Sequence, residues 1–160
     1  MVIKKKESIH PSNGIIIRYD GIIDIDALYK GVKSWFVSHK YDYYESENTE
    51  KNKPQGNTLI IKMLAQREID DYVRFDFEVD FDEIKKVKKL SKGYSGEARI
   101  TIRCFMTFDY KGNWTLLPFL FYIYNNVILK KKILTYYWVK AYDEMMELNS
   151  YIKSTLGLIE

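Results

Sequence analysis

Alternation of apolar and polar residues dominates the middle of the chain. From position 73 to 81 every second residue is apolar and the residues between them are charged. Segments 58–67 and 97–110 alternate in the same way. Because successive side chains of a strand point to opposite faces, this pattern predicts antiparallel strands with one buried and one solvated face.

A different spacing predicts a helix nearer the N-terminus. Apolar residues between positions 25 and 36 recur at intervals of three and four, which places them on one helix face. Asp24 or Asp26 can cap the start of this helix. We expect about three helical turns that end near His39.

Two further segments complete the predicted sheet. Segment 14–21 lies between glycines and segment 41–48 is rich in tyrosine, so both predict strands, with a polar loop at 49–57. We therefore predict one α+β domain over 1–160, in the order strand, helix, four strands, long helix. Its five-stranded, mainly antiparallel sheet is preceded by a flexible basic tail over 1–12.

The C-terminal helix is too long to be straight. A single helix over 116–156 would measure about 60 Å, whereas a domain of this size is about 40 Å across. We predict a bend between Asn125 and Lys132, with the second half packed on one face of the sheet. That half carries an amphipathic stripe, which consists of Leu134, Trp138, Ala141, Met145, Leu148, Ile152 and Leu156.

The first half of this helix is apolar around its whole circumference. Its apolar segment, 116–129, is shorter than the roughly 20 residues that span a bilayer, so it does not predict a transmembrane helix. Three interpretations remain: enclosure within the domain, a surface for a second copy or a protein partner, or in-plane contact with a membrane. The candidate interaction surface consists of Phe119, Phe121, Tyr122, Tyr124, Tyr136 and Tyr137.

Composition narrows the function little. The chain has 14 Tyr, 8 Phe and 3 Trp, and tyrosine suits ligand pockets, partner surfaces and sheet faces alike. A net charge of +3 neither requires nor excludes a nucleic acid or an anionic membrane. A single cysteine, Cys104, predicts no internal disulfide, and the N-terminus has no apolar signal segment. We therefore expect a cytoplasmic location.

Charges of opposite sign fill the polar positions of the two best strands. Acidic residues dominate 68–83 and basic residues dominate 84–103. If these strands form a hairpin, a register with Asp80 opposite Arg99 also sets Asp76 opposite Arg103. We predict that register, and we interpret the charges as a solvated, self-complementary sheet face rather than a cation site.

No catalytic or metal-binding arrangement is evident in the sequence. Neither histidine has a second ligand at metal-binding spacing, and Cys104 falls on the apolar face of its strand. An enzyme would have to rest on residues such as Tyr41, Tyr43 and Glu45 meeting in a pocket. We expect a non-enzymatic protein without a cofactor.

Three functions follow as hypotheses. The first is an interaction or assembly module that uses the aromatic surface of the C-terminal helix. The second rests on the element order, which resembles that of helix-grip, START-like proteins, although with fewer strands and one early helix where two are usual. That resemblance implies a carrier of a small apolar ligand between sheet and helix, with a cavity formed by Trp35, Phe75, Phe77, Ile102, Met106, Trp138 and Met145.

The third hypothesis is a nucleic-acid or membrane-surface binder. Clustered lysines with tyrosines nearby could bind phosphate groups if the clusters converge in space. The candidate basic patch consists of Lys85, Lys86, Lys88, Lys89, Lys130, Lys131 and Lys132.

Overall fold

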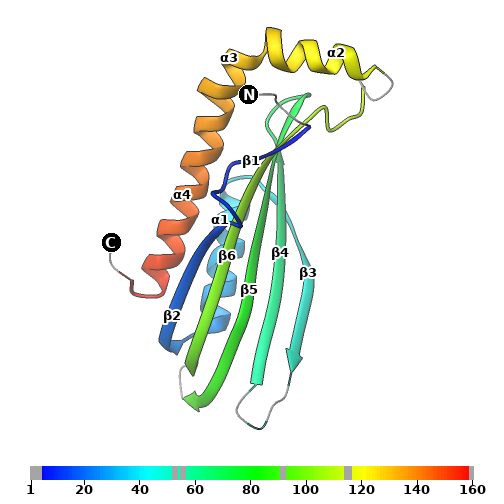
Figure 1. The fold of residues 1–160 in the computed structure, drawn as a ribbon. Coiled ribbons are helices and arrows are strands. Elements are labelled where there is room, and N and C mark those ends of the chain that lie inside the picture. The colour runs from blue at the N-terminus through cyan, green and yellow to red at the C-terminus, as the bar shows by residue number, and fades with distance from the viewer. Residues whose placement is uncertain (1–4, 52–53, 55–56, 91–92, 114–116, 159–160) are drawn as a thin grey trace.

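The computed structural model describes residues 5–51, 54, 57–90, 93–113 and 117–158 (Figure 1). For residue 57 and for 82–90 and 93–95 it describes the backbone alone. Its strands and helices form an α+β fold, as the sequence predicts.

Within the described residues the sheet has six strands, and every pairing among them is antiparallel. The spatial order is β1-β6-β5-β4-β3, and β2 also pairs with β6. The strands are β1 (Lys6–Ser8), β2 (Ile15–Ile23), β3 (Asp42–Lys51), β4 (Asn57–Glu68), β5 (Val73–Leu90) and β6 (Gly93–Phe108). The sequence predicts all of these except β1, and it predicts a much shorter β5.

β1 and β2 together form one interrupted edge strand. Both pair with β6, β1 opposite residues 105–107 and β2 opposite residues 94–102. Between them the chain leaves the edge of β6. The prediction of a flexible tail over 1–12 is therefore wrong for residues 6–10, because Ile9 and His10 are buried against the sheet. Residues 1–4 lie outside the described part of the chain.

Helix α1 (Ile25–Ser38) confirms the helix predicted from the spacing. Its cap is Asp24, whose side chain accepts a hydrogen bond of 3.0 Å from the backbone N–H of Ala27. Gly31 has a packing role on this helix. A Cβ at that position would lie 2.8 Å from the hydroxyl of Tyr151, so glycine allows α1 and the C-terminal helix to approach closely.

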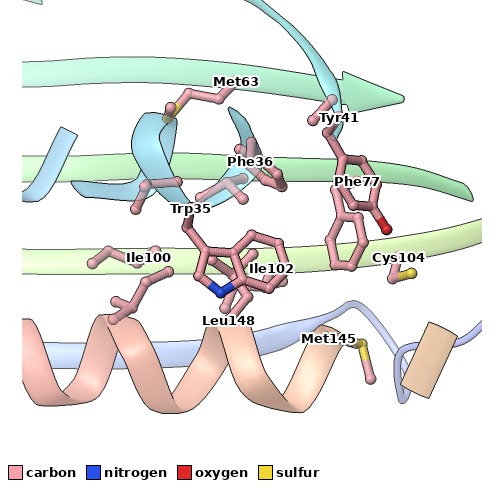
Figure 2. Close-up of a cluster of buried hydrophobic side chains, with 14 of the residues drawn as sticks. Trp35, Phe36, Tyr41, Met63, Phe77, Ile100, Ile102, Cys104, Met145 and Leu148 are labelled. Atoms are coloured by element: carbon pink, nitrogen blue, oxygen red, sulfur yellow. The ribbon is translucent and has the colours of Figure 1, made fainter. Parts of the chain in front are cut away.

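The hydrophobic core lies between one face of the sheet and the helices on that side (Figure 2). Phe75 and Phe77 of β5 and Ile100 and Ile102 of β6 are buried there, as the alternating pattern predicts. Each such side chain contributes about 1.5–3 kcal/mol when it is fully buried. Period-two alternation therefore identified the buried face of the sheet correctly.

The hairpin of β5 and β6 forms, but the predicted register is wrong by two residues. Asp80 lies opposite Thr101, and Asp76 lies opposite Phe105. The observed register sets Glu78 opposite Arg103 and aligns the backbone of residue 82 with Arg99. Like the predicted register, the observed one sets acidic residues opposite both arginines of β6. Charge complementarity alone could therefore not distinguish the two.

The C-terminal helix bends at Leu129, within the interval that the sequence predicts. Its segments are α2 (Pro118–Ile123), the π-helical turn η1 (Tyr124–Ile128), α3 (Lys130–Lys132), the π-helical turn η2 (Ile133–Tyr137) and α4 (Trp138–Thr155). Leu129 has ψ −8°, which departs from the value of an α-helix. Figure 1 shows α2 running across one end of the sheet, whereas α4 runs alongside the strands.

The buried stripe of the second half begins differently from the prediction. Ala141, Met145, Leu148 and Ile152 are buried as expected, but Leu134 is 38% exposed. Ile133 and Tyr137 are buried in its place. The wider π-helical turn η2 explains the difference, because it changes which residues face the sheet.

No described helix has both the length and the apolar character needed to cross a bilayer.

Candidate functional site

An apolar groove lies between α4 and the interruption of the edge strand. Its volume is about 530 Å³. Figure 1 shows the N-terminal segment (blue), which forms one wall, between α4 and the strands. The described residues that line the groove are Ile9, Pro11, Ile15, Trp138, Tyr142, Met145, Met146 and Asn149.

The interruption between β1 and β2 creates the first wall. Gly14 adopts φ +115°, and a Cβ there would lie 2.9 Å from the carbonyl oxygen of Ile102. The backbone N–H of Gly14 donates a hydrogen bond of 2.9 Å to the carbonyl of Pro11 and closes a turn. Glycine is thus required where the chain leaves the edge of β6, and this turn brings Pro11 and Ile15 to the groove.

His10 holds the same wall against the sheet. Its Nδ1 lies 3.1 Å from both the N–H and the carbonyl oxygen of Cys104. Its ring packs edge-on against Phe105. Burial lowers the pKa of His10, despite the opposing effect of its hydrogen bond with the Cys104 carbonyl, so the imidazole is neutral near pH 7.

The second wall is one face of α4. The rings of Trp138 and Tyr142 stack with centroids 5.3 Å apart and planes at 11°. Met145 and Met146 follow one turn further along the helix. Methionine side chains are flexible and polarizable, so this wall combines a flat aromatic surface with an adaptable one.

One amide side chain, that of Asn149, is found among the described residues that line the groove, and the others are aliphatic or aromatic. Asn149 is 3% exposed, and its Oδ1, which is itself buried, has no hydrogen-bond partner among the described residues. Buried polar atoms are nearly always hydrogen-bonded, and an unpaired one costs about 1–3 kcal/mol. Among the described lining residues none carries a formal charge.

The residues predicted to form a ligand cavity divide into two groups. Trp138 and Met145 line the groove. The other five are tightly packed in the core beneath it and are at most 5% exposed, namely Trp35, Phe75, Phe77, Ile102 and Met106. The groove therefore lies at the edge of the sheet rather than at its centre. Pro11 and Gly14 are the sequence signal that could have indicated it.

The predicted interaction surface is exposed only in part. Phe119, Tyr122 and Tyr136 are exposed, and Phe121 and Tyr124 are partly buried. Tyr137 is buried, and its hydroxyl donates a hydrogen bond to Asp70. The front half of the helix is thus not enclosed by the described part of the domain.

Polar contacts attach this front half to the turn between β4 and β5. The hydroxyl of Tyr72 donates a hydrogen bond to Asn125, and the rings of Tyr72 and Tyr124 pack edge-on with centroids 5.0 Å apart. Burial by itself would raise the pKa of Asp70, but hydrogen bonds from Tyr137 and from backbone N–H groups lower it overall.

The predicted basic patch is described only in its second cluster. Lys131 and Lys132 are exposed, and Lys130 is partly buried. The ammonium of Lys132 lies over the ring of Tyr137, 5.3 Å from its centroid. The side chains of Lys85, Lys86, Lys88 and Lys89 lie outside the described residues, so whether the two clusters converge stays a prediction.

The polar residues considered for catalysis form structural contacts. Tyr29 hydrogen-bonds to Tyr43 and Glu45, whereas Tyr41 donates a bond of 2.8 Å to Glu144 on α4. Burial raises the pKa of Tyr29, Tyr41 and Tyr43, so these hydroxyls stay protonated near pH 7.

On the solvated face of the sheet, arginine side chains form ion pairs with neighbouring aspartates. Arg74 contacts Asp76 and Arg103 contacts Asp80, each at 2.7 Å. Within the described residues, no group of three or more His, Cys, Asp or Glu side chains could hold a metal ion.

Comparison of the chain with protein-family models, with curated proteins and with solved structures found no match.

Proposed function

We propose that this protein binds a small apolar molecule in the groove between α4 and residues 9–15. One observation carries the proposal: a groove of about 530 Å³ whose lining is almost wholly apolar. Pockets for small molecules typically measure 300–1,000 Å³ and combine apolar and aromatic walls with few polar groups. The groove fits this description in both size and lining.

The construction of the groove supports the same proposal. One wall is a helix whose adjoining face is buried in the core, and the other is fixed to β6 by hydrogen bonds of Ile9 and His10. A preformed site loses little conformational freedom on binding. Its position beside the C-terminal helix is also consistent with the element order that resembles helix-grip proteins.

The proposal is tested by filling the groove. Met146 is partly buried in the lining, and Met146→Trp would occupy the space of a ligand without removing a core side chain. Val139 is 45% exposed on the same helix and lies outside the lining, so Val139→Trp is the matched control. The probe is Nile red, an uncharged dye whose emission rises in apolar surroundings.

Wild-type protein and Val139→Trp should bind the dye saturably and with the same affinity. Met146→Trp should weaken binding about tenfold or more, because the indole takes the place of the dye. Equal dye binding by all three proteins, with unchanged circular dichroism, would show that the groove is not the binding site and would refute the proposal.

A second proposal concerns the arm, by which we mean residues 117–128. Leu117, Phe119, Leu120, Tyr122, Val127 and Ile128 are exposed apolar residues of the arm. The arm contains no charged residue. Because the cores of subunit interfaces are depleted of charge and rich in aromatic residues, we propose that a second copy of this chain covers the arm.

Sedimentation velocity tests the second proposal. The wild type should sediment as a dimer that Phe119→Lys dissociates, since a charge would be buried without a partner. Ile22→Lys replaces an equally apolar residue, 62% exposed on β2, and should leave the dimer intact. A wild-type monomer at every concentration would contradict this proposal without affecting the first.

A further inference from the structure

We infer that protonation of His10 detaches the first wall of the groove from β6, so that acidification releases the bound molecule. This inference rests on the proposed function and adds a form of regulation to the same site. It follows from the way in which residues 9–14 are attached to the edge strand and from the kind of hydrogen bond that the histidine makes.

The first wall is attached to β6 at several points along the interruption. The backbone N–H of Ile9 donates to the carbonyl of Cys104 at 2.8 Å, and the guanidinium of Arg103 donates to the carbonyl of Asn13 at 3.0 Å. Between them lies His10, whose Nδ1 is 3.1 Å from the backbone N–H of Cys104. The imidazole thus supplies the acceptor that the backbone of an uninterrupted edge strand would provide.

This contact requires a neutral ring. A ring nitrogen accepts a hydrogen bond only when it carries no proton, whereas both nitrogens of an imidazolium are donors. Protonated Nδ1 can donate to the carbonyl oxygen of Cys104, which lies at the same distance and already accepts from Ile9. The N–H of Cys104, a residue with no exposed surface, would then be left without an acceptor. An unpaired buried donor is unfavourable, so the proton favours release of the ring.

The surroundings of His10 also oppose a positive charge. Burial is the largest cause of its lowered pKa, and Arg103 of β6 lowers it further, whereas Glu78 of β5 acts against them. From β1, the ammonium of Lys6 lies 4.2 Å from the centroid of Phe105, the ring on which His10 packs edge-on. Helix α4 contributes no charged residue to the described lining that could compensate an imidazolium.

Release of the ring would change the groove directly. Ile9 and Pro11, the neighbours of His10 in the chain, both line it. A ligand that contacts them binds only the attached state, so its apparent affinity falls in proportion to the fraction of molecules that are attached. By the reciprocity of linked equilibria, the bound ligand must in turn lower the pKa of His10 further.

The test measures binding of Nile red to the full-length protein at about pH 7.5 and about pH 5, on either side of the ordinary histidine pKa. The dye is uncharged at both values. The wild type should bind it about threefold or more weakly at the lower pH. His10→Gln should bind it equally at both, because an amide oxygen accepts from the N–H of Cys104 at any pH.

His39 provides the matched control. It is the second of the two histidines in the chain, and it contacts Glu147 rather than the lining of the groove. His39→Gln should therefore lose as much dye binding at the lower pH as the wild type does. Circular dichroism at both pH values should stay the same for all three proteins, since only the first wall moves.

Proton NMR of the histidine rings gives a second, independent measurement on the wild type. The signal that is missing in His39→Gln belongs to His39, which assigns the other signal to His10. Saturation with Nile red should move the titration midpoint of His10 to lower pH and leave that of His39 unchanged.

The outcomes separate this inference from the function on which it rests. Equal affinity of the wild type at the two pH values would overturn the inference and leave the groove as a binding site. An equal loss of binding in His10→Gln, a His10 midpoint that the dye does not move, or unfolding of the wild type at the lower pH would also overturn it. Failure of Met146→Trp to weaken dye binding at the higher pH would instead remove the proposed function itself.

Discussion

The two halves of the bent C-terminal helix differ in a way that their sequences do not suggest. The arm is the more apolar half, yet Phe119 is 72% exposed and Val127 is 71% exposed. Helix α4 has many charged residues, yet Met145, Leu148 and Ile152 are completely buried. Burial in this protein follows the arrangement of apolar residues rather than their number.

The comparison shows why apolar residues that share one helix face become buried. On α4 the apolar residues lie on one face, so one sheet can cover them all. On the arm they surround the helix, and the described part of the domain covers only one side. That side is held largely by polar contacts, such as the hydrogen bond from Tyr72 to Asn125. The arm therefore has apolar surface available for a partner. The apolar residues of α4, in contrast, pack in the core or line the groove.

The largest expected difference in stability is between two truncations, one in each half of the helix. Leu148→Ala should lower the free energy of unfolding by about 2–5 kcal/mol, because it leaves a cavity in the core. Val127→Ala should change it by less than about 0.5 kcal/mol, since an exposed side chain has little to lose. Urea denaturation of both variants checks the pair. Equal losses would show that the arm is buried in solution.

A smaller loss of stability is expected when a hydrogen-bonded carboxylate of α4 is removed. Glu144 accepts hydrogen bonds from Arg67 at 2.7 Å and from Tyr41 at 2.8 Å, and it is largely buried. Glu144→Ala should cost about 1–3 kcal/mol, because it leaves the buried hydroxyl of Tyr41 without its acceptor and removes one of the two acceptors of the partly buried Arg67.

Glu147 is the matched control for that substitution. It lies on the same helix and contacts His39 at 3.0 Å, but its side chain is 57% exposed. Glu147→Ala should cost less than about 1 kcal/mol, as surface ion pairs generally do. A loss as large as that of Glu144→Ala in the same urea titration would contradict the role given to burial.

The smallest expected effect is the pH dependence of stability that comes from His10, in the first wall of the groove. The pKa of His10 is lowered below its ordinary value of 6.5 by burial, with Arg103 acting in the same direction and Glu78 against it. The unfolded chain therefore takes up a proton more readily than the folded one as the pH falls below 6.5. The stability associated with neutral His10 is present above that pH and is lost below it.

A urea titration at about pH 8 and about pH 5 measures this effect, with His10→Gln as the variant that cannot titrate. The wild type should lose more stability between the two pH values than His10→Gln does. If His10→Gln shows the same loss as the wild type, His10 does not control the pH dependence.

The sheet and the bend could be predicted because each rests on a strong local rule. Alternation identified Phe75, Phe77, Ile100 and Ile102 as core residues, and the length of segment 116–156 required a bend. The register of β5 and β6 could not be predicted in this way, because two registers both pair acids with bases. It is fixed by the packing of the whole sheet, which local sequence does not report.

The groove was harder to predict than the fold. It depends on residues 11–14 leaving the edge of β6, and the short strand β1 before them has no alternating pattern long enough to recognise. The unpaired atom of Asn149 is a property of the folded environment alone. In the sequence, Asn149 is one polar residue on an amphipathic helix that has many.

Site-resolved binding tests the central claim, that a small apolar molecule occupies the groove beside α4. The chain has five methionines, and two of them, Met145 and Met146, line the groove, whereas Met63 and Met106 are buried in the core. NMR spectra of protein labelled with carbon-13 at the methionine methyl groups can be recorded during addition of Nile red. The methyl signals of Met145 and Met146 should shift saturably while those of Met63 and Met106 stay in place; unchanged Met145 and Met146 signals, or equal shifts of all four, would contradict the claim.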